Sequence, residues 1–294
     1  MFTQYIAQLN GAESTQKSYI ETGRHLLRFL QEGKYPYITP QVIQAFLYDL
    51  QLKGLANATI RKHYRNLRAV FRYALKTGII KSNPIDSVPE PAICNQKVKR
   101  PFSPAEITLM LSAIENDLDP YHLKIRNRTI LLTLYDTGIR TGALVNIKVR
   151  DLNLDAHTIE IIEKGNKPNH LVGFGTQTGA AIRKHLNTIP DLPDCFLFPN
   201  RNGRQLTIYG IYKMIQKTCD QAGVDRRKVH MLRYSYTGQA LINGMDKGAI
   251  QKQLGHTTTA MIDQIYGSHV LQQWQIAQQI MYSPGDRLTG GMQK

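Results

Sequence analysis

Residues 230–267 read HMLRYSYTGQALINGMDKGAIQKQLGHTTTAMIDQIYG, and this stretch decides how the chain is interpreted. His230 and Arg233 stand three residues apart, which places them on one face of a helical turn. Leu254-Gly255-His256 puts a second histidine beside a helix stop signal, and Tyr266 follows ten residues later. Each of these residues alone is more often structural, so their meaning depends on what the rest of the chain supplies.

Two upstream segments supply further cations. The run DTGIRTG places Arg140 between two glycines at the end of a predicted helix. Thr158–Glu163 is β-branched and predicts a short strand, with Leu171–Phe174 as its possible hairpin partner. The turn between the two strands, 164–168, carries Lys164.

The rest of the second half is predicted to be helical. Ser103-Pro104-Ala105-Glu106 is typical of a helix start, with Ser103 as the cap and Glu106 completing a capping box. Helices are expected near 104–116, 124–137, 177–187, 207–222, 231–243, 247–254, 259–264 and 270–281.

The first half predicts helices near 14–31, 40–53 and 58–77. In the third helix an apolar face lies beside one basic stripe, formed by Arg61, Arg65, Arg68, Arg72 and Lys76. The stripe is about 22 Å long at 1.5 Å per residue. Almost no acid lies in that helix to neutralise it, so we expect these cations to contact phosphates rather than form a solvated charged face.

A proline-rich break separates the halves. Residues 83–100, NPIDSVPEPAICNQKVKR, contain three prolines and end in a basic cluster, Lys97, Lys99 and Arg100, which is also a candidate DNA contact. We therefore predict a first domain over 1–83, a linker over 84–100, a second domain over 101–282 and a flexible tail over 283–294.

Composition points to a polyanionic partner. The chain of 294 residues holds 37 Lys and Arg against 22 Asp and Glu, a net charge of +15, and both halves are basic. The three cysteines form no C-x-x-C pair. No apolar run reaches the length of a membrane span, and the first residues lack a secretion signal, so a cytoplasmic protein is expected.

Motifs for nucleotide or metal chemistry are not found in the sequence. It shows neither a Gly-rich phosphate loop nor a metal-ligand cluster at a recognisable spacing, so we expect no cofactor and no metal. Metal-free work on a phosphodiester needs cations around the phosphorus, an acid for the leaving oxygen and a nucleophile.

The order T-G-I-R, K-G-N-K, H-x-x-R, L-G-H, I-Y resembles the tyrosine recombinase (phage integrase) family, especially its small Xer-like and transposon-resolvase members. The resemblance covers nearly the whole chain. It implies a mainly α fold with a small β-hairpin or sheet, in which a helical SAM-like core-binding domain and a catalytic domain form a two-domain clamp around DNA.

The resemblance also implies roles for six residues. Arg140 and Arg233 would hold the scissile phosphate, and Lys164 would protonate the departing 5′ oxygen. His230 would help to remove the proton of the nucleophile, His256 would donate to a phosphate oxygen, and Tyr266 would form a 3′-phosphotyrosine. The chain departs from the family pattern in three places: Ala143 stands in place of the usual Glu, Tyr234 in place of a frequent His, and Pro168-Asn169 in place of an acidic-basic pair.

The segment after Tyr266 predicts a partner. Val270, Trp274, Ala277 and Met281 form an apolar stripe on a helix near 270–281, which either packs on its own domain or docks into a neighbouring subunit, as the family's helix exchange implies. We expect two protomers on an inverted-repeat DNA site, a homo-tetramer on two sites and exchange through a Holliday junction. A different recombinase or an accessory protein could complete the assembly.

Two alternatives stay open at the level of sequence. A type IB topoisomerase would use the same chemistry as a monomer, and an inactive DNA-binding protein could share the fold.

Charge and predicted loop position suggest further DNA contacts at Arg201, Arg204, Arg226, Arg227 and Lys228.

Overall fold

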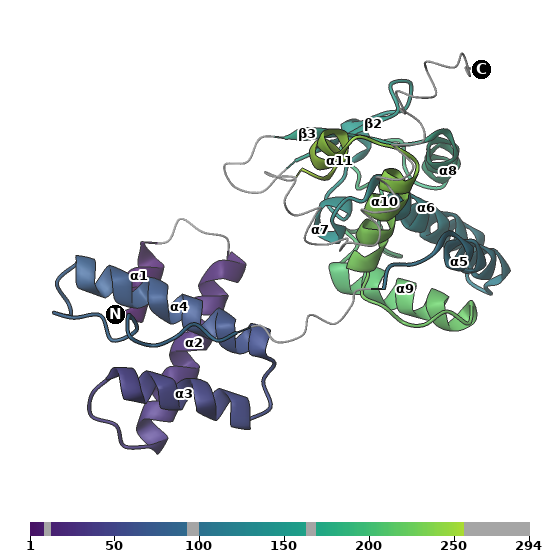
Figure 1. Cartoon of the computed structure of the whole chain (residues 1–294). Coiled ribbons are helices and arrows are strands. Elements are labelled where there is room, and N and C mark those ends of the chain that lie inside the picture. The colour runs from purple at the N-terminus through teal and green to yellow at the C-terminus, as the bar shows by residue number, and fades with distance from the viewer. Residues whose placement is uncertain (9–12, 93–99, 163–168, 256–294) are drawn as a thin grey trace, which may run out of the picture. The chain divides into compact units, whose positions relative to one another are not determined.

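The structure is a computed structural model that describes residues 1–8, 13–92, 100–162 and 169–255. The chain divides into two compact units, residues 1–98 and 99–294 (Figure 1). Each unit is described by itself.

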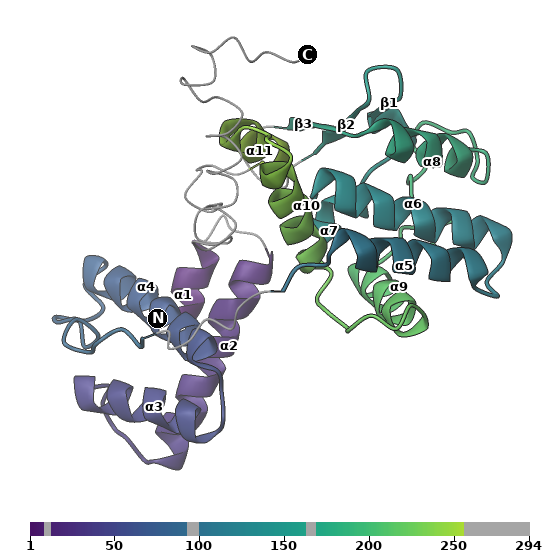
Figure 2. The same cartoon turned by 45° about the vertical axis from the view of Figure 1, so that its right-hand side comes forward.

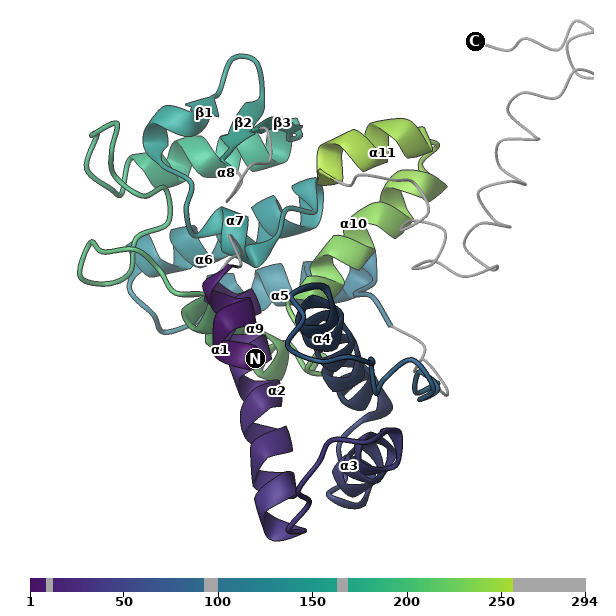
Figure 3. The same ribbon diagram turned by 90° about the vertical axis from the view of Figure 1, so that its left-hand side faces the viewer.

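The first unit is helical in its described residues. It contains α1 (Phe2–Ala7), α2 (Glu13–Glu32), α3 (Pro40–Leu52) and α4 (Asn57–Lys76). The Thr39 hydroxyl caps α3 by accepting a hydrogen bond from the Val42 amide (3.3 Å). Helix α4 packs on both α2 and α3 (Figure 3), and side chains including Phe46, Leu67 and Phe71 form the core. The three predicted helices are confirmed, whereas α1 was not predicted.

Part of the proline-rich break belongs to this unit. Ile85 and Val88, which the sequence placed in the linker, are buried in the core of the first unit. The Tyr64 hydroxyl donates a hydrogen bond to the Val88 carbonyl (2.9 Å). The chain therefore packs on the first unit beyond residue 83 before it reaches residues 93–99, which lie outside the described part.

The second unit surrounds a larger core. Its helices are α5 (Pro104–Asn116), α6 (Tyr121–Thr137), α7 (Thr141–Leu144), α8 (Thr176–Leu186), α9 (Ile208–Gln221), α10 (His230–Ile242) and α11 (Lys247–Leu254), with a 3-10 turn at Val149–Asp151. Helix α6 packs against α5, α8 and α10 (Figure 2). The predicted capping box is confirmed, because Ser103 Oγ accepts from the Glu106 amide and Glu106 Oε2 accepts from the Ser103 amide.

A small antiparallel sheet completes this unit. Its strands, β1 (Leu152–Asn153), β2 (Thr158–Ile161) and β3 (His170–Gly173), lie in the order β1-β2-β3. Ile159 pairs with Val172, and Ile161 with His170. Inward-facing Ile159 and Val172 are fully buried, which fixes the register.

The predicted fold class, mainly α with a small β element in the second half, is confirmed. The predicted pairing of β2 with β3 is confirmed as well, whereas the two-residue β1 and the four-residue α7 were not predicted. The helices expected near 259–264 and 270–281 lie outside the described residues. Among the described helices, none is long and apolar enough to cross a membrane.

Candidate active site and DNA-binding surface

Three of the six predicted site residues are described. Arg140 is the N-cap residue of α7, His230 is the first residue of α10, and Arg233 follows one turn later in α10. Lys164, His256 and Tyr266 lie outside the described residues, so the structure describes only the segments that lead to them.

Arg233 joins three segments of the second unit. Its side chain is buried, with 6% of the residue exposed. Nη1 donates to the carbonyl of Gly138 (2.7 Å), and Nη2 donates to the carbonyl of Leu254 (2.8 Å). Because these carbonyls end α6 and α11, the guanidinium meets the negative ends of two helix dipoles. One tied segment continues to Arg140 and the other to residue 256.

Gly138 has no room for a side chain. It ends α6 in the left-handed conformation, with φ +64°, which favours glycine. A Cβ atom here would lie 2.5 Å from Tyr236 Cδ1 and 2.8 Å from Leu254 Cδ2. The close approach of α10 and α11 to the end of α6 therefore depends on this glycine. Gly138 also sets the position at which the chain turns toward Arg140.

Arg140 is half-buried at the edge of a depression of about 510 Å³. Ala143, the first departure from the family pattern, also lines this depression. Gln205 lines the same depression, and its Nε2 donates to the Val145 carbonyl (3.1 Å) and to Asn146 Oδ1 (3.0 Å). These bonds hold the loop before α9 against the end of α7.

His230 is exposed at the start of α10. Its ring meets the largely buried Tyr234 ring edge-on, with centroids 5.1 Å apart and an interplanar angle of 89°. An aromatic pair of this geometry restricts the orientation of the imidazole. Tyr234, the second departure from the family pattern, therefore supports His230 by packing.

Helix α11 is attached to the sheet through Gln253. Its amide nitrogen donates to the Gly173 carbonyl (2.7 Å), and its Oε1 accepts from the Gly173 amide (3.0 Å). This side chain pairs with β3 as a neighbouring strand would, and Figure 2 shows α11 beside β3. Nothing in the spacing of the sequence singled out Gln253.

His170 connects the hairpin to the chain that leads into residue 256. A Cβ atom on Gly255, where φ is +61°, would lie 2.8 Å from a ring carbon of His170. His170 is paired with Ile161 across the hairpin whose loop carries Lys164. The described ends of the segments that hold Lys164 and His256 are therefore neighbours, which the sequence motifs did not show.

The basic stripe on α4 is neutralised in part from outside its helix. Glu90 Oε1 accepts from Arg61 Nε (2.5 Å) and from Arg65 Nε (2.8 Å). These two guanidinium groups hold the pKa of Glu90 at about 2. Arg68, Arg72 and Lys76 form no ion pair within the described part of the chain.

Several other predicted DNA contacts are engaged in ion pairs. Arg100 pairs with Glu106 and Asp225, Arg201 with Asp119, and Arg226 with Asp220. Lys97 and Lys99 lie outside the described residues. Arg204 and Lys228 are exposed and make no ion pair with any described residue.

The structure corrects the expectation for Arg227. Its side chain is only 8% exposed, pairs with Glu106 and lies over the Phe102 ring, 4.7 Å from the centroid. We therefore assign Arg227 a structural role at the start of α5, where a buried guanidinium is not available to a phosphate.

Two family models match this chain. The phage integrase family matches residues 101–272, and the phage integrase SAM-like domain matches residues 1–92.

Curated relatives match over most of the chain. Tyrosine recombinase XerC of Listeria innocua is 29% identical over 280 residues, which cover 92% of this chain and 91% of the relative. Tyrosine recombinase XerC of Staphylococcus carnosus is 30% identical over 254 residues, or 83% of each chain. Tyrosine recombinase XerD of Oceanobacillus iheyensis is 27% identical over 256 residues, covering 83% of this chain and 84% of the relative.

Solved structures share the fold. The Tn1549 transposon integrase in complex with transposon right end DNA has a TM-score of 0.75 at 19% identity, covering 96% of this chain and 99% of the other. The XerH site-specific recombinase bound to a palindromic difH substrate has a TM-score of 0.74 at 22% identity, covering 92% and 81%.

Proposed function

The chain belongs to the phage integrase family and is a tyrosine site-specific recombinase, and from this premise we propose that it cleaves DNA with Tyr266. In this proposal the Tyr266 oxygen attacks the scissile phosphorus, and a 3′-phosphotyrosine forms while the 5′ oxygen leaves. Rejoining exchanges one phosphodiester for another with little change in bond energy, so no ATP is needed, and in this proposal cationic side chains rather than a metal stabilise the charge on the phosphate.

The other five residues stabilise this exchange. Arg140 and Arg233 bind the non-bridging oxygens, because a guanidinium stays charged and donates two parallel hydrogen bonds. Lys164 protonates the leaving oxygen, His230 accepts the tyrosine proton, and His256 donates to the phosphate. A free tyrosine has a pKa near 10, so ionising it at pH 7 costs about 4 kcal/mol, which these cations offset.

One observation carries the proposal: Arg233 is bonded to the carbonyls of Gly138 and Leu254. These residues stand two positions before Arg140 and His256, respectively. The contact of Gly255 with His170 adds the base of the hairpin that carries Lys164. This convergence supports a shared site for the proposed catalytic residues.

We propose that the first unit holds the DNA through the exposed cations of α4. Arg72 and Lys76 are exposed, Arg68 is half-buried, and none of the three is ion-paired to a described residue. Burial of Ile85 and Val88 supports extending the core-binding domain beyond residue 83, with the catalytic domain at 101–282 and a tail at 283–294. In this proposal Lys97 and Lys99 add phosphate contacts.

Assembly is proposed to follow the solved relatives. XerH is bound to a palindromic site, and a lambda integrase dimer is bound to a core site. For this chain we infer two protomers on an inverted repeat, a tetramer on two sites, and docking of the helix near 270–281 into a neighbouring subunit. The reaction would take place on cytoplasmic, nucleoid DNA and would serve dimer resolution, integration and excision, or transposon resolution.

Covalent capture on DNA tests the proposal. The full-length protein is mixed with fragmented DNA from its source in the presence of a chelator and quenched with SDS, and protein-linked fragments are sequenced. Adducts that share an inverted repeat and disappear in Tyr266→Phe are the expected result. Adducts at scattered sequences would favour a topoisomerase. A nicked substrate that blocks religation is used in parallel, and the lack of any adduct on it would contradict the proposal.

A further inference from the structure

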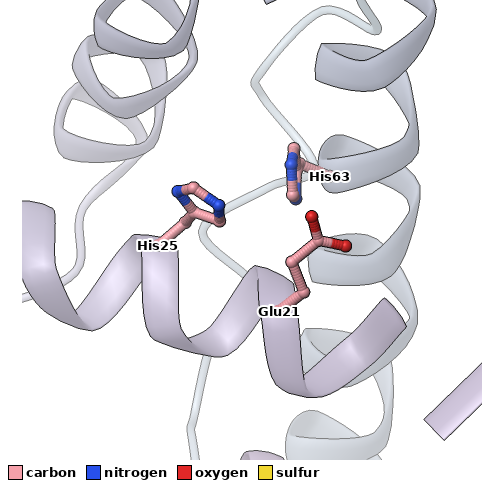
Figure 4. A group of neighbouring side chains, drawn as sticks. All are labelled: Glu21, His25 and His63. Atoms are coloured by element: carbon pink, nitrogen blue, oxygen red, sulfur yellow. The ribbon is translucent and has the colours of Figure 1, made fainter. Parts of the chain in front are cut away.

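Three side chains with metal-binding groups meet in the first unit, between α2 and α4 (Figure 4). Glu21 and His25 stand four residues apart on α2, hence on one face of that helix, and His63 comes from α4. One ligand atom from each residue lies within 4.8 Å of the other two. Glu21 and His25 are exposed, whereas His63 is fully buried.

The hydrogen bonds of Thr22 assign the tautomer of His63. The Thr22 hydroxyl donates to the Ser18 carbonyl (3.0 Å), and its oxygen accepts from Asn66 Nδ2 (2.9 Å). His63 Nδ1 lies 2.8 Å from the same oxygen. A hydroxyl has one proton and two lone pairs, so all three contacts are satisfied only if Nδ1 carries the proton and donates. His63 Nε2 then holds a free lone pair.

That lone pair has no partner within the described residues. His63 Nε2 is one of two buried side-chain atoms in the described part of the chain that lack a hydrogen bond. An unsatisfied buried polar atom costs about 1–3 kcal/mol, and native structures keep few of them.

We propose that Glu21, His25 and His63 form a binding site for a divalent transition metal ion of the Zn²⁺ class. Two imidazole nitrogens with one carboxylate oxygen suit Zn²⁺ and its neighbours, whereas Ca²⁺ and Mg²⁺ prefer oxygen ligands throughout. Thr22 serves as the outer partner that fixes the tautomer of a metal-bound histidine. This site goes beyond the proposed recombination chemistry and includes none of its residues.

The residues around the proposed site determine which further ligand an ion can gain and which side chain competes with the ion for Glu21. A depression of about 590 Å³ opens at Glu21 and His25, so a water molecule can complete the coordination. Lys62 Nζ lies 2.8 Å from Glu21 Oε2 and competes for the carboxylate, and Lys17 and Arg24 line the same depression. The Lys62 side chain is 40% exposed and can swing into solvent when an ion binds.

A bound ion would cross-link α2 to α4, the helix that carries the basic stripe. In the described structure, the Lys62–Glu21 ion pair joins exposed side chains of the two helices. An exposed ion pair stabilises a protein only a little. We therefore infer a structural role for the metal. Its binding raises the thermal stability of the first unit, and its removal by a chelator leaves DNA cleavage intact.

Zinc titration of the full-length protein tests the site. Protein stripped with a chelator is titrated with Zn²⁺ against a chromophoric competitor, and Co²⁺ provides an absorption spectrum that reports nitrogen and oxygen ligands. We expect one tight ion per chain and a higher melting temperature. His25→Ala and Glu21→Gln alter exposed side chains and should weaken binding at least about tenfold with the fold intact. Lys62→Gln should tighten binding, because it removes the competing ammonium.

The matched control is His122→Ala, an exposed histidine on α6 in the second unit, which should bind Zn²⁺ as the unchanged chain does. Failure to bind one Zn²⁺ per chain would overturn the proposal. So would binding that His25→Ala and Glu21→Gln leave unchanged, since the ion would then occupy another site. Because DNA cleavage is measured separately, failure of the metal site is distinguishable from failure of the recombinase proposal.

Discussion

Arg233 Nη1 donates a 2.7 Å hydrogen bond to the carbonyl of Gly138, two residues before Arg140. The arginine proposed to bind phosphate is therefore also the residue that positions the other arginine. A buried guanidinium that satisfies two helix ends is fixed before DNA arrives, and preorganised donors stabilise developing charge without reorganisation. Because only Arg233 is assigned both roles, the effects of replacing Arg233 and Arg140 on stability and on cleavage can be distinguished by experiment.

Arg233→Lys should reduce both stability and cleavage. A lysine keeps the charge but cannot span the carbonyls of Gly138 and Leu254, so we expect a loss of roughly 2–3 kcal/mol in the free energy of unfolding. Arg140→Lys should abolish most cleavage with a much smaller change in stability. Chemical unfolding and adduct formation on a nicked site measure the two effects. Equal stability of the two variants would contradict the positioning role of Arg233.

Gln253→Ala should loosen the attachment of α11 to β3. It removes two hydrogen bonds to Gly173, so unfolding should become easier by about 1–2 kcal/mol. The rate of cleavage should fall as well, because α11 leads into His256 and β3 follows the hairpin loop that carries Lys164. Lys252→Ala, at an exposed neighbouring position, is the control. Single-turnover cleavage that is as fast as in the unchanged protein would argue against this attachment as a positioning element.

Glu90→Gln should strengthen DNA binding. It releases Arg61 and Arg65, and each cation that gains a phosphate contact steepens the dependence of log affinity on log salt by about 0.9. Arg72→Ala should weaken binding and reduce that slope by about 1. The measurement is DNA affinity over a series of salt concentrations, with Lys53→Ala as the control. A Glu90→Gln protein with unchanged affinity and slope would place the DNA on another face.

The stability of the second unit should fall in acid through Glu106. Hydrogen bonds from Arg227 lower the pKa of Glu106 to about 2 in the folded protein, against a burial effect that raises it. A pKa that is lower in the folded than in the unfolded state stabilises above about pH 4.5, and this stabilisation is lost as the pH falls toward 2.

Glu106→Gln should therefore destabilise by about 1–2 kcal/mol at pH 7, after allowance for solvent screening, and the difference should shrink between pH 4.5 and 2. Urea unfolding followed by circular dichroism over this pH range measures it. Glu115→Gln, which removes an exposed ion pair with Arg128, is the control and should change stability by less than about 1 kcal/mol. A Glu106→Gln deficit that stays constant from pH 7 to 2 would rule out the assigned ion pair.

Local patterns predicted most of the elements. Helical periodicity located α2, α3 and α4, the Ser103–Glu106 box located the start of α5, and β-branched residues located β2. Short elements were missed, because the four residues of α7 and the two of β1 are stabilised by tertiary packing rather than by a repeating pattern.

Contacts between distant segments could not be predicted. Glu90 neutralises Arg61 across 29 residues, and His63 meets α2 across about 40 residues. The sequence placed Glu90 in the predicted linker. His25 and His63 lie too far apart along the chain to form a recognisable metal-ligand motif. The motif residues were found because their order along the chain matched a family. Gln253 acts instead through tertiary hydrogen bonds and His170 through a packing contact, and no motif records either of them.

The central claim is that Tyr266 is the nucleophile, and the most direct test is to identify the residue that carries the DNA. The protein is trapped on a nicked target site in chelator, the adduct is digested with nuclease and protease, and the peptides are analysed by mass spectrometry. We predict a nucleotide attached through its 3′ phosphate to Tyr266, and no modified peptide from Tyr266→Phe. A nucleotide attached to any other residue, or an adduct that persists in Tyr266→Phe, would contradict the account.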